Sequence, residues 1–263
     1  MLIYYYLHCM KNEQINRRKA LIIAVLLISG ISAFGQQYRS ITALRFNYYT
    51  DDRSSLEYEE VFIIPLVDQY HLITGVLGNA SDFEAAFGGK IGLAFDLPGF
   101  YYGEASYSYE RKFDDPAETY MNTLYGSLSY ETGGIRASLS LTGELSDDTW
   151  GIKLSPGLNY RVRTDWELYA KYFSAYNRYN DDQYFNHAIW AGTEYEILPT
   201  VWLHGGGTFG TVYEPENSYE KWSAIAGLRV LPLPDLTVRY QFEYEVNPLY
   251  EIISNGIVVD YKF

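Results

Sequence analysis

The last thirteen residues of the chain, Glu251 to Phe263, read EIISNGIVVDYKF and decide its fold. Apolar or aromatic side chains stand at every second position from Ile257 to Phe263, and mostly polar or small residues alternate with them from Gly256 to Lys262. Successive side chains of a β-strand leave opposite faces of the backbone, so a period of two predicts a strand with one apolar face. We therefore predict that the chain ends on a two-faced strand and a terminal aromatic residue.

The same alternation recurs along the rest of the chain. The clearest segments lie at 83–96, 101–110, 135–145, 150–161 and 236–246, and weaker ones at 38–49, 56–67, 70–78, 119–130, 166–178, 184–197, 201–213, 222–231 and 251–263. A tilted strand of about 10 residues crosses the apolar layer of a membrane. We therefore predict an all-β fold, a single antiparallel up-and-down transmembrane β-barrel of fourteen strands. Pro65 interrupts the 56–78 region, so twelve strands are the alternative, because single-chain bacterial barrels use even numbers.

A closing strand of this kind resembles the final strand of bacterial outer-membrane β-barrels. The resemblance implies a porin-like barrel surrounded by outer-membrane lipid. It also implies that the barrel-insertion machinery reads the C-terminal strand, with Ile257, Val259, Tyr261 and Phe263 as the signal. A more distant likeness to YaiO-type barrels, which are linked to surface-polysaccharide systems, concerns size and has no specific motif behind it.

The N-terminus has the pattern of a secretory signal peptide. Basic residues between Lys11 and Lys19 precede an apolar run from Ala20 to Ile28, and a small-x-small site follows at Ala33 to Gly35. The nine apolar residues are too few for a membrane-spanning helix, which needs about 20. We expect residues 1–35 to be a cleaved signal peptide with Met10 as the true start, and residues 36–263 to form the barrel. This predicts export to the outer membrane by the general secretory route.

Charge and cysteine content exclude several classes of function. Cys9 is the only cysteine and lies in the predicted signal peptide, so the mature chain has no disulfide, thiolate metal site or cysteine nucleophile. The formal net charge of the whole chain is −13. Such acidity argues against a nucleic-acid partner, because phosphate binding requires a basic surface. No motif predicts a cofactor.

The connections between the predicted strands are of two alternating kinds. Short ones with turn chemistry lie at 68–69, 96–99, 131–134, 163–165, 198–200 and 232–235. The others carry carboxylates, namely Asp51, Asp52, Asp114, Asp115, Asp147, Asp148, Asp181, Asp182, Glu214, Glu216 and Glu220. Strand parity puts all acidic connections at one end, and barrel topology places the longer loops outside the cell. We expect the acidic loops to form a solvated, repulsive rim, and a site for divalent cations, which take oxygen ligands, is the alternative.

Charged residues on the polar faces of the strands are expected to point inward. A lipid-facing Arg or Lys at mid-depth costs about 2–4 kcal/mol, and rings of lumenal charge are how pores select solutes. The candidate lumen-lining residues are Glu104, Arg136, Glu144, Lys153, Arg161, Glu167, Lys171, Glu194, Arg229, Arg239, Glu243 and Glu245. We predict a monomeric, passive porin-like channel for ions or small hydrophilic solutes, with a weak cation preference from its acidic outer mouth.

Two other functions stay open. In the first, lumenal ion pairs close the bore, and the barrel is a non-conducting structural protein or belongs to a surface-polysaccharide or assembly system. The second is an outer-membrane lipid hydrolase with a histidine beside a serine nucleophile. His71, His187 and His204 have no serine in close alternation, so we expect no enzyme and no metal site. Most tryptophans are expected in the interfacial girdles rather than facing carbohydrate.

Overall fold

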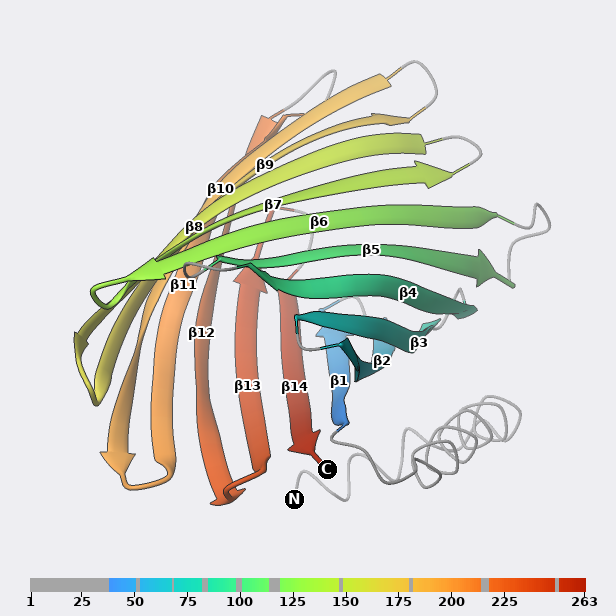
Figure 1. The fold of residues 1–263 in the computed structure, drawn as a ribbon. Coiled ribbons are helices and arrows are strands. Elements are labelled where there is room, and N and C mark those ends of the chain that lie inside the picture. The colour runs from blue at the N-terminus through green and yellow to red at the C-terminus, as the bar shows by residue number, and fades with distance from the viewer. Residues whose placement is uncertain are drawn as a thin grey trace, which may run out of the picture. The chain divides into compact units, whose positions relative to one another are not determined.

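The computed structural model describes residues 38–50, 53–67, 69–81, 85–97, 101–113, 119–146, 149–179, 182–213, 218–248 and 251–263. Within these ranges fourteen strands form one closed antiparallel barrel (Figure 1). No helix in the described part of the chain is long and apolar enough to cross a membrane. The predicted all-β up-and-down barrel of fourteen strands is confirmed, and the twelve-strand alternative is wrong. The predicted signal peptide, residues 1–35, lies outside the described residues.

The strands follow one another around the barrel in chain order. Their bounds are β1 Arg39–Tyr49, β2 Ser54–Val67, β3 Tyr70–Ser81, β4 Ala85–Leu97, β5 Tyr101–Lys112, β6 Tyr120–Thr132, β7 Ile135–Ser146, β8 Thr149–Arg163, β9 Trp166–Tyr179, β10 Asp182–Leu198, β11 Val201–Tyr213, β12 Ser218–Leu233, β13 Leu236–Val246 and β14 Glu251–Lys262. The strand predicted from the last thirteen residues is β14. It pairs with β13 on one side and with β1 on the other, and this second pairing closes the sheet.

The two ends of the barrel differ in their connections. One end, called here the turn end, carries the connections β2–β3, β4–β5, β6–β7, β8–β9, β10–β11 and β12–β13, together with the start of β1 and the end of β14. The opposite end is called the loop end. At the turn end Gly133 and Gly134 both have positive φ, 57° and 82°, as a two-residue type I′ hairpin turn requires. Four of these connections also follow a register shift, which fits a bulge beside a tight turn.

The wall is two-faced, as a membrane barrel requires. Alternate residues of each strand point out of the barrel and into it, and cross-strand pairing joins those that share a side into an outward series and an inward series. The outward series includes large exposed apolar residues, namely Phe87, Ile91, Leu124, Leu128, Leu139, Leu141, Ile152, Leu158, Ile189 and Phe209. Glu60 departs from this division. It belongs to the outward series of β2, is only 4% exposed, and accepts a hydrogen bond of 2.7 Å from the Tyr58 hydroxyl.

The region in which the predicted pattern was weakest has a distinct interior. Val61 and Ile63 on β2, Ile73 on β3 and Ala94 on β4 all belong to the inward series and pack together, and Ile73 is 2% exposed. We call these four residues the apolar wall. Apolar residues therefore occupy both faces of β2 and β3, which weakens the alternation between polar and apolar positions. Pro65 is accommodated by a register shift between Pro65 and Val67.

Candidate functional site: the lumenal cavity

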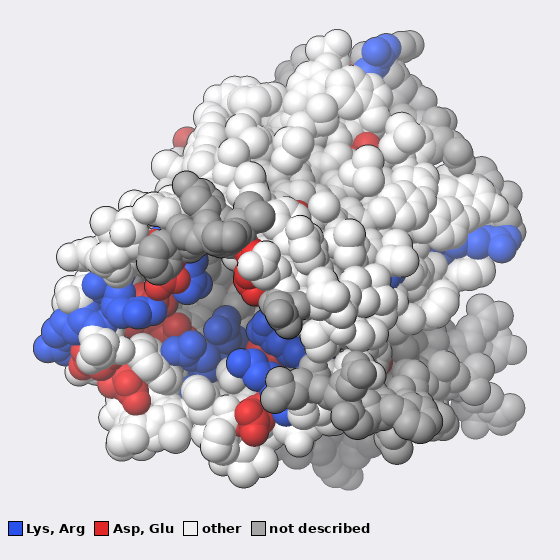
Figure 2. All heavy atoms as spheres, viewed as in Figure 1, with Lys and Arg blue, Asp and Glu red and all other residues white. Residues whose placement is uncertain are grey.

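A cavity of about 1040 Å³ occupies the barrel interior and is the candidate site. Its charged lining consists of six arginines and seven carboxylates, namely Arg39, Arg45, Arg136, Arg161, Arg229, Arg239, Glu57, Glu59, Glu110, Glu167, Glu194, Glu243 and Asp260. Figure 2 shows the hollow, with basic and acidic side chains gathered around it while the neighbouring surface is mostly uncharged. The lining is therefore highly charged but close to neutral overall.

The register places all twelve predicted lumenal charges on the inward face of the barrel. Seven of them line the cavity: Arg136, Arg161, Glu167, Glu194, Arg229, Arg239 and Glu243. The other five, Glu104, Glu144, Lys153, Lys171 and Glu245, are not part of its lining. Among these five, Lys153 and Lys171 lie 5.0 and 5.2 Å from the Phe173 ring centroid, and Glu245 pairs with Lys221 at 2.8 Å.

Nine inward charged residues lie near the turn end, on β1, β6 to β10 and β12 to β14. We call them the turn-end ring: Arg39, Glu131, Arg136, Arg161, Glu167, Glu194, Arg229, Arg239 and Asp260. Their positions follow from register, because Glu131 is paired with Arg136 beside one turn, Arg161 with Glu167 beside the next, and Arg229 with Arg239 beside a third. Short turns between long strands thus bring residues that are distant in sequence to one level of the barrel.

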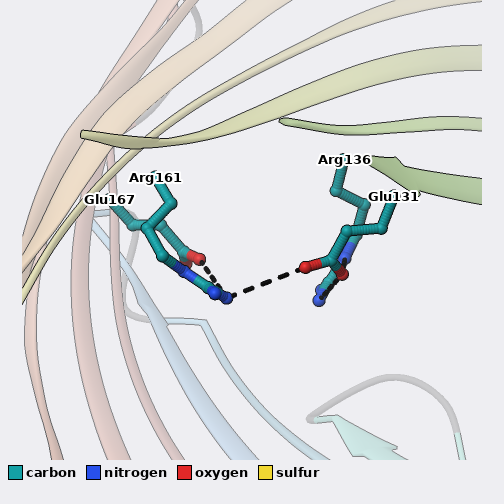
Figure 3. A network of polar contacts seen from close by, with 4 residues as sticks. All are labelled: Glu131, Arg136, Arg161 and Glu167. Carbon is teal, nitrogen blue, oxygen red and sulfur yellow. Dashed lines mark hydrogen bonds and ion pairs between the residues drawn. The ribbon is translucent and has the colours of Figure 1, made fainter. Parts of the chain in front are cut away.

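The part of the ring on β6 to β9 is a linked network (Figure 3). Glu131 Oε2 accepts hydrogen bonds from Arg136 Nε and Nη2 at 3.0 and 2.7 Å. Arg161 Nη2 lies 3.8 Å from the other Glu131 oxygen and 3.6 Å from Glu167 Oε1. The side chains of Glu131, Arg136 and Arg161 are 40–49% exposed, so water screens these pairs and each contributes little to stability.

Two further pairs complete most of the ring. Arg39 holds Asp260 across the closing seam through two hydrogen bonds, from Nε at 2.8 Å and from Nη2 at 2.7 Å. Arg229 Nε lies 3.1 Å from Glu194 Oε1, and these side chains are only 21% and 13% exposed. The Arg229 guanidinium also lies 4.5 Å from the Trp202 ring centroid. This pair is the most enclosed of the ring, because the indole covers one side of the guanidinium.

Arg239 and Arg45 differ from the other lining arginines. Within the described residues neither forms an ion pair, although both line the cavity. Arg239 is the cross-strand partner of Arg229, whose carboxylate partner Glu194 is already engaged. The cavity therefore contains two guanidinium groups whose donors are available to a solute.

An aromatic pair on β9 and β10 also lines the cavity. Tyr169 on β9 stacks on Trp190 on β10 with 4.2 Å between ring centroids and 22° between ring planes. The Tyr169 hydroxyl crosses β10 and donates to the Gly205 carbonyl on β11 at 3.3 Å. Gly192 lies beneath it, and a Cβ at this position would collide with the Tyr169 ring and hydroxyl. Gly192 therefore allows the tyrosine to lie flat against the wall, a close approach that a larger residue would prevent.

The histidines named in the sequence analysis lie apart from one another. His71 is an inward residue with Nε2 3.6 Å from Asp96 Oδ2, His187 faces outward between Phe185 and Tyr213, and His204 lines the cavity. In the described ranges no serine hydroxyl is hydrogen-bonded to a histidine, and no three His, Cys, Asp or Glu residues gather as metal ligands. Most of the acidic loop residues, for which cation binding was the alternative to a solvated rim, lie outside the described residues.

The tryptophans divide between the two faces. Trp150, Trp166 and Trp222 belong to the outward series and are 37–44% exposed, where interfacial girdle residues are expected. Trp190 and Trp202 instead face inward, and Trp190 lines the cavity. Sequence reasoning missed this lumenal use of Trp190 and also missed Tyr169. Strand parity assigns Trp190 to the polar face of its strand and was the available signal.

The C-terminal strand places the residues of the predicted insertion signal on the outer surface. Ile257, Val259 and Tyr261 belong to the outward series, and Ile257 is 42% exposed. Phe263 follows the strand, is 51% exposed, and packs edge-on against Tyr261 with 4.4 Å between ring centroids. Its backbone N–H donates to the Tyr38 carbonyl at 2.7 Å, so the chain end is held at the seam.

No family model and no curated protein match the sequence. Solved structures do match. A bacterial polysaccharide outer membrane secretin matches with a TM-score of 0.61 and 10% identity, over 88% of this chain and 100% of that one. The CymD monoaromatic hydrocarbon channel gives 0.60 and 10% over 87% and 88%, and outer membrane protein Omp33 of Acinetobacter baumannii gives 0.55 and 13% over 88% and 100%. The chain therefore has the fold of the bacterial outer-membrane β-barrels.

Proposed function

We propose that the protein is a passive channel of the bacterial outer membrane for ions or small hydrophilic solutes. The observation that carries this proposal is the combination of an apolar outer surface with a charged interior cavity of about 1040 Å³. Charged side chains that remain 40–49% exposed inside a closed barrel need water around them, as Glu131, Arg136 and Arg161 do. A water-filled interior admits solutes that the lipid excludes.

The proposed orientation puts the turn end in the periplasm and the loop end outside the cell, as in bacterial barrels generally. The cavity lining is nearly balanced in charge, so the mouths decide the selectivity. At the loop end the connecting residues are rich in aspartate, for example Asp51 and Asp52 after β1 and Asp147 and Asp148 after β7. Acidic mouths concentrate cations and repel anions. A weak cation preference follows.

Conductance in a planar lipid bilayer tests this function. Purified, folded protein is expected to give discrete conductance steps, and a KCl gradient is expected to give a reversal potential displaced slightly toward that of K⁺. A mock purification from cells that lack the gene is the control for contaminating porins. Repeated insertion without conductance steps would contradict the channel, and a reversal potential on the chloride side would contradict the cation preference.

A non-conducting structural or polysaccharide-associated barrel is the second candidate. Eight of the nine turn-end ring residues are engaged in ion pairs with one another. Ser106, Ser155 and Ser223, which belong to the inward series, are only 3–7% exposed, so neighbouring side chains fill parts of the interior. The name of one matching structure, a polysaccharide secretin, adds a second reason. Liposomes that contain the protein are expected to swell in a solution of a small sugar if the protein is a channel, and not if the barrel is non-conducting.

The C-terminal strand is proposed to direct insertion into the outer membrane. Ile257, Val259, Tyr261 and Phe263 offer an apolar outward stripe at the chain end, with Phe263 exposed. Phe263→Ala is expected to lower the amount of folded barrel in outer membranes, measured by heat-modifiable gel migration. Ile91→Ala, an exposed outward residue far from the chain end, is the control. Equal amounts of both variants would contradict a signalling role for Phe263.

A further inference from the structure

One side of the cavity combines an aromatic surface with hydrogen-bonding groups of both kinds. Tyr169 and Trp190, called here the lumenal shelf, line the cavity together with Glu167, Glu194, His204 and Arg239. They come from the consecutive strands β9, β10 and β11 and from β13, on which Arg239 is directly opposite Arg229, the ion-pair partner of Glu194. Cross-strand register fixes their neighbourhood, because Glu194 is directly opposite both Glu167 and His204, and Tyr169 is directly opposite Gly192.

The lumenal shelf is held flat by its own contacts. Trp190 supports one face of Tyr169, and the Tyr169 hydroxyl is anchored to the Gly205 carbonyl. Gly192 and Gly206, which are cross-strand partners, leave the wall without side chains at this level. A flat aromatic surface beside a smooth wall accepts the apolar C–H face of a ring, and little side-chain entropy is lost because the shelf is already ordered.

The polar groups around the shelf specify the rest of the ligand. Glu167 and Glu194 each form an ion pair with one arginine, Arg161 and Arg229, and their carboxylate oxygens keep lone pairs that can accept from the hydroxyls of a ligand. Arg239 offers several N–H donors and, among the described residues, has no ion-pair partner. A planar guanidinium without a partner matches a carboxylate, which it binds through two parallel hydrogen bonds.

We propose that this wall is a binding subsite for an acidic sugar ring, such as a uronate residue of a short saccharide. The C–H face of the ring lies on the lumenal shelf, its hydroxyls donate to Glu167 and Glu194, and its carboxylate accepts from Arg239. An aromatic acid would fill the shelf and reach Arg239 but would offer no hydroxyl donors to the remaining lone pairs of the two glutamates. A neutral sugar would leave Arg239 without an acceptor. This inference rests on the proposed channel function, for which it names the solute class.

Isothermal titration calorimetry on the folded barrel in detergent micelles tests the subsite without any need for conduction. The probes are trigalacturonate, the neutral trisaccharide galactotriose and benzoate. Trigalacturonate is expected to bind at least tenfold more tightly than galactotriose, because only its carboxylate uses Arg239. Benzoate is expected to bind more weakly than trigalacturonate. Equal affinities for the two saccharides, or tighter binding of benzoate, would overturn the proposal.

Substitutions at single residues test which side chains bind the saccharide. Arg239→Gln is expected to weaken trigalacturonate binding about tenfold and to leave galactotriose binding unchanged. Tyr169→Ala is expected to weaken both saccharides severalfold, since it removes the stacking surface. Lys153→Gln is the matched control, because Lys153 is an inward cation without an ion-pair partner in the described residues but outside the cavity lining. If Lys153→Gln weakens trigalacturonate as much as Arg239→Gln does, the binding is general electrostatic attraction and the subsite is wrong.

Heat-modifiable gel migration shows whether each variant is folded before titration. The calorimetric result is independent of the bilayer measurement. Saccharide binding without conductance steps would contradict only the proposed channel, and conductance steps without saccharide binding would contradict only the subsite.

Discussion

Two parts of the inward face of the barrel differ in what they enclose. The apolar wall of β2 to β4 excludes water, and Ile73 and Ala94 are 2% and 1% exposed. The cavity lining, most of which comes from β7 to β14 and β1, is charged and keeps a hollow of about 1040 Å³. Both parts are built by the same alternation of side chains. Alternation therefore determines which side chains point inward, whereas packing against the rest of the interior determines whether they meet water.

An ion pair borders the apolar wall. Lys90 Nζ on β4 lies 3.4 Å from Glu59 Oε1 on β2, so the pair spans the intervening strand β3. Gly75 on β3 is the cross-strand partner of both Lys90 and Val61, and it has no side chain to separate the two charged residues. The transition from dry to wet interior thus occurs within a few residues.

Replacing an isoleucine by alanine in each of the two regions is expected to give the largest difference in the free energy of unfolding. Ile73→Ala in the apolar wall is expected to lower the free energy of unfolding by about 3 kcal/mol, because it leaves a buried cavity. Ile41→Ala, which removes the same atoms from the lining of the open cavity, is expected to cost about 1 kcal/mol. Urea titration of the barrel in lipid vesicles measures both. Equal losses would show that the two regions are equally dry.

Breaking the enclosed ion pair of the turn-end ring, Arg229 with Glu194, is expected to give the next largest loss in the free energy of unfolding. Glu194→Gln preserves shape but leaves the Arg229 guanidinium, 21% exposed, without its counter-charge. A loss of about 2 kcal/mol in the free energy of unfolding is expected, less than for a fully buried pair because water still reaches the site. The same titration measures it, with the Arg45→Gln variant, which breaks no ion pair, as control. A loss no larger than that of the control would contradict the enclosure of this pair.

Filling the space beneath Tyr169 is expected to have a slightly smaller effect on stability and a clear effect on conduction. The Cβ of Gly192→Ala would meet the Tyr169 ring and lie 2.5 Å from the Gly205 carbonyl oxygen. We expect a cost of about 1–2 kcal/mol and a smaller conductance step, because Tyr169 is displaced into the cavity. Gly143→Ala is the control, since its Cβ would meet no atom within 4 Å. An unchanged step size would show that Tyr169 does not border the conducting path.

The exposed network of Figure 3 is expected to give the smallest change in stability. Arg136→Gln removes a pair whose side chains are 49% and 40% exposed, so the free energy of unfolding should fall by less than about 1 kcal/mol. The same variant is expected to move the reversal potential further toward that of K⁺, because it removes a lumenal positive charge. A large stability loss with an unchanged reversal potential would assign the network a structural role instead.

Much of the fold could be predicted from the sequence, for a physical reason. A strand that separates lipid from an aqueous interior must alternate, and long segments such as Ile135–Ser146 show this directly. The 56–78 region was ambiguous because β2 and β3 carry apolar residues on both faces. Its pairing was decided by neighbours distant in sequence, such as Ala94 on β4 against Ile73 on β3.

The candidate site could be predicted only in part. The alternation of side chains along each strand placed Arg136, Glu194 and Arg239 on the inward face. It could not show which of the charged residues form ion pairs with one another. The pairing of Arg39 with Asp260 joins the first strand to the last, and the ring that includes both depends on closure of the barrel. The position of Tyr169 depends on Gly192 of the neighbouring strand β10, which no local pattern relates to it.

The sequence by itself determined the strands, their two faces and the sign of the charges at each position, because these follow from local alternation and from the cost of charge in lipid. The closing strand, Glu251 to Phe263, contains all three kinds of information. Only the tertiary structure decided which part of the interior is dry, which arginines form no ion pair within the described residues, and that an aromatic pair lines the same cavity. Those properties depend on distances between side chains of different strands, and such distances are set when the sheet closes.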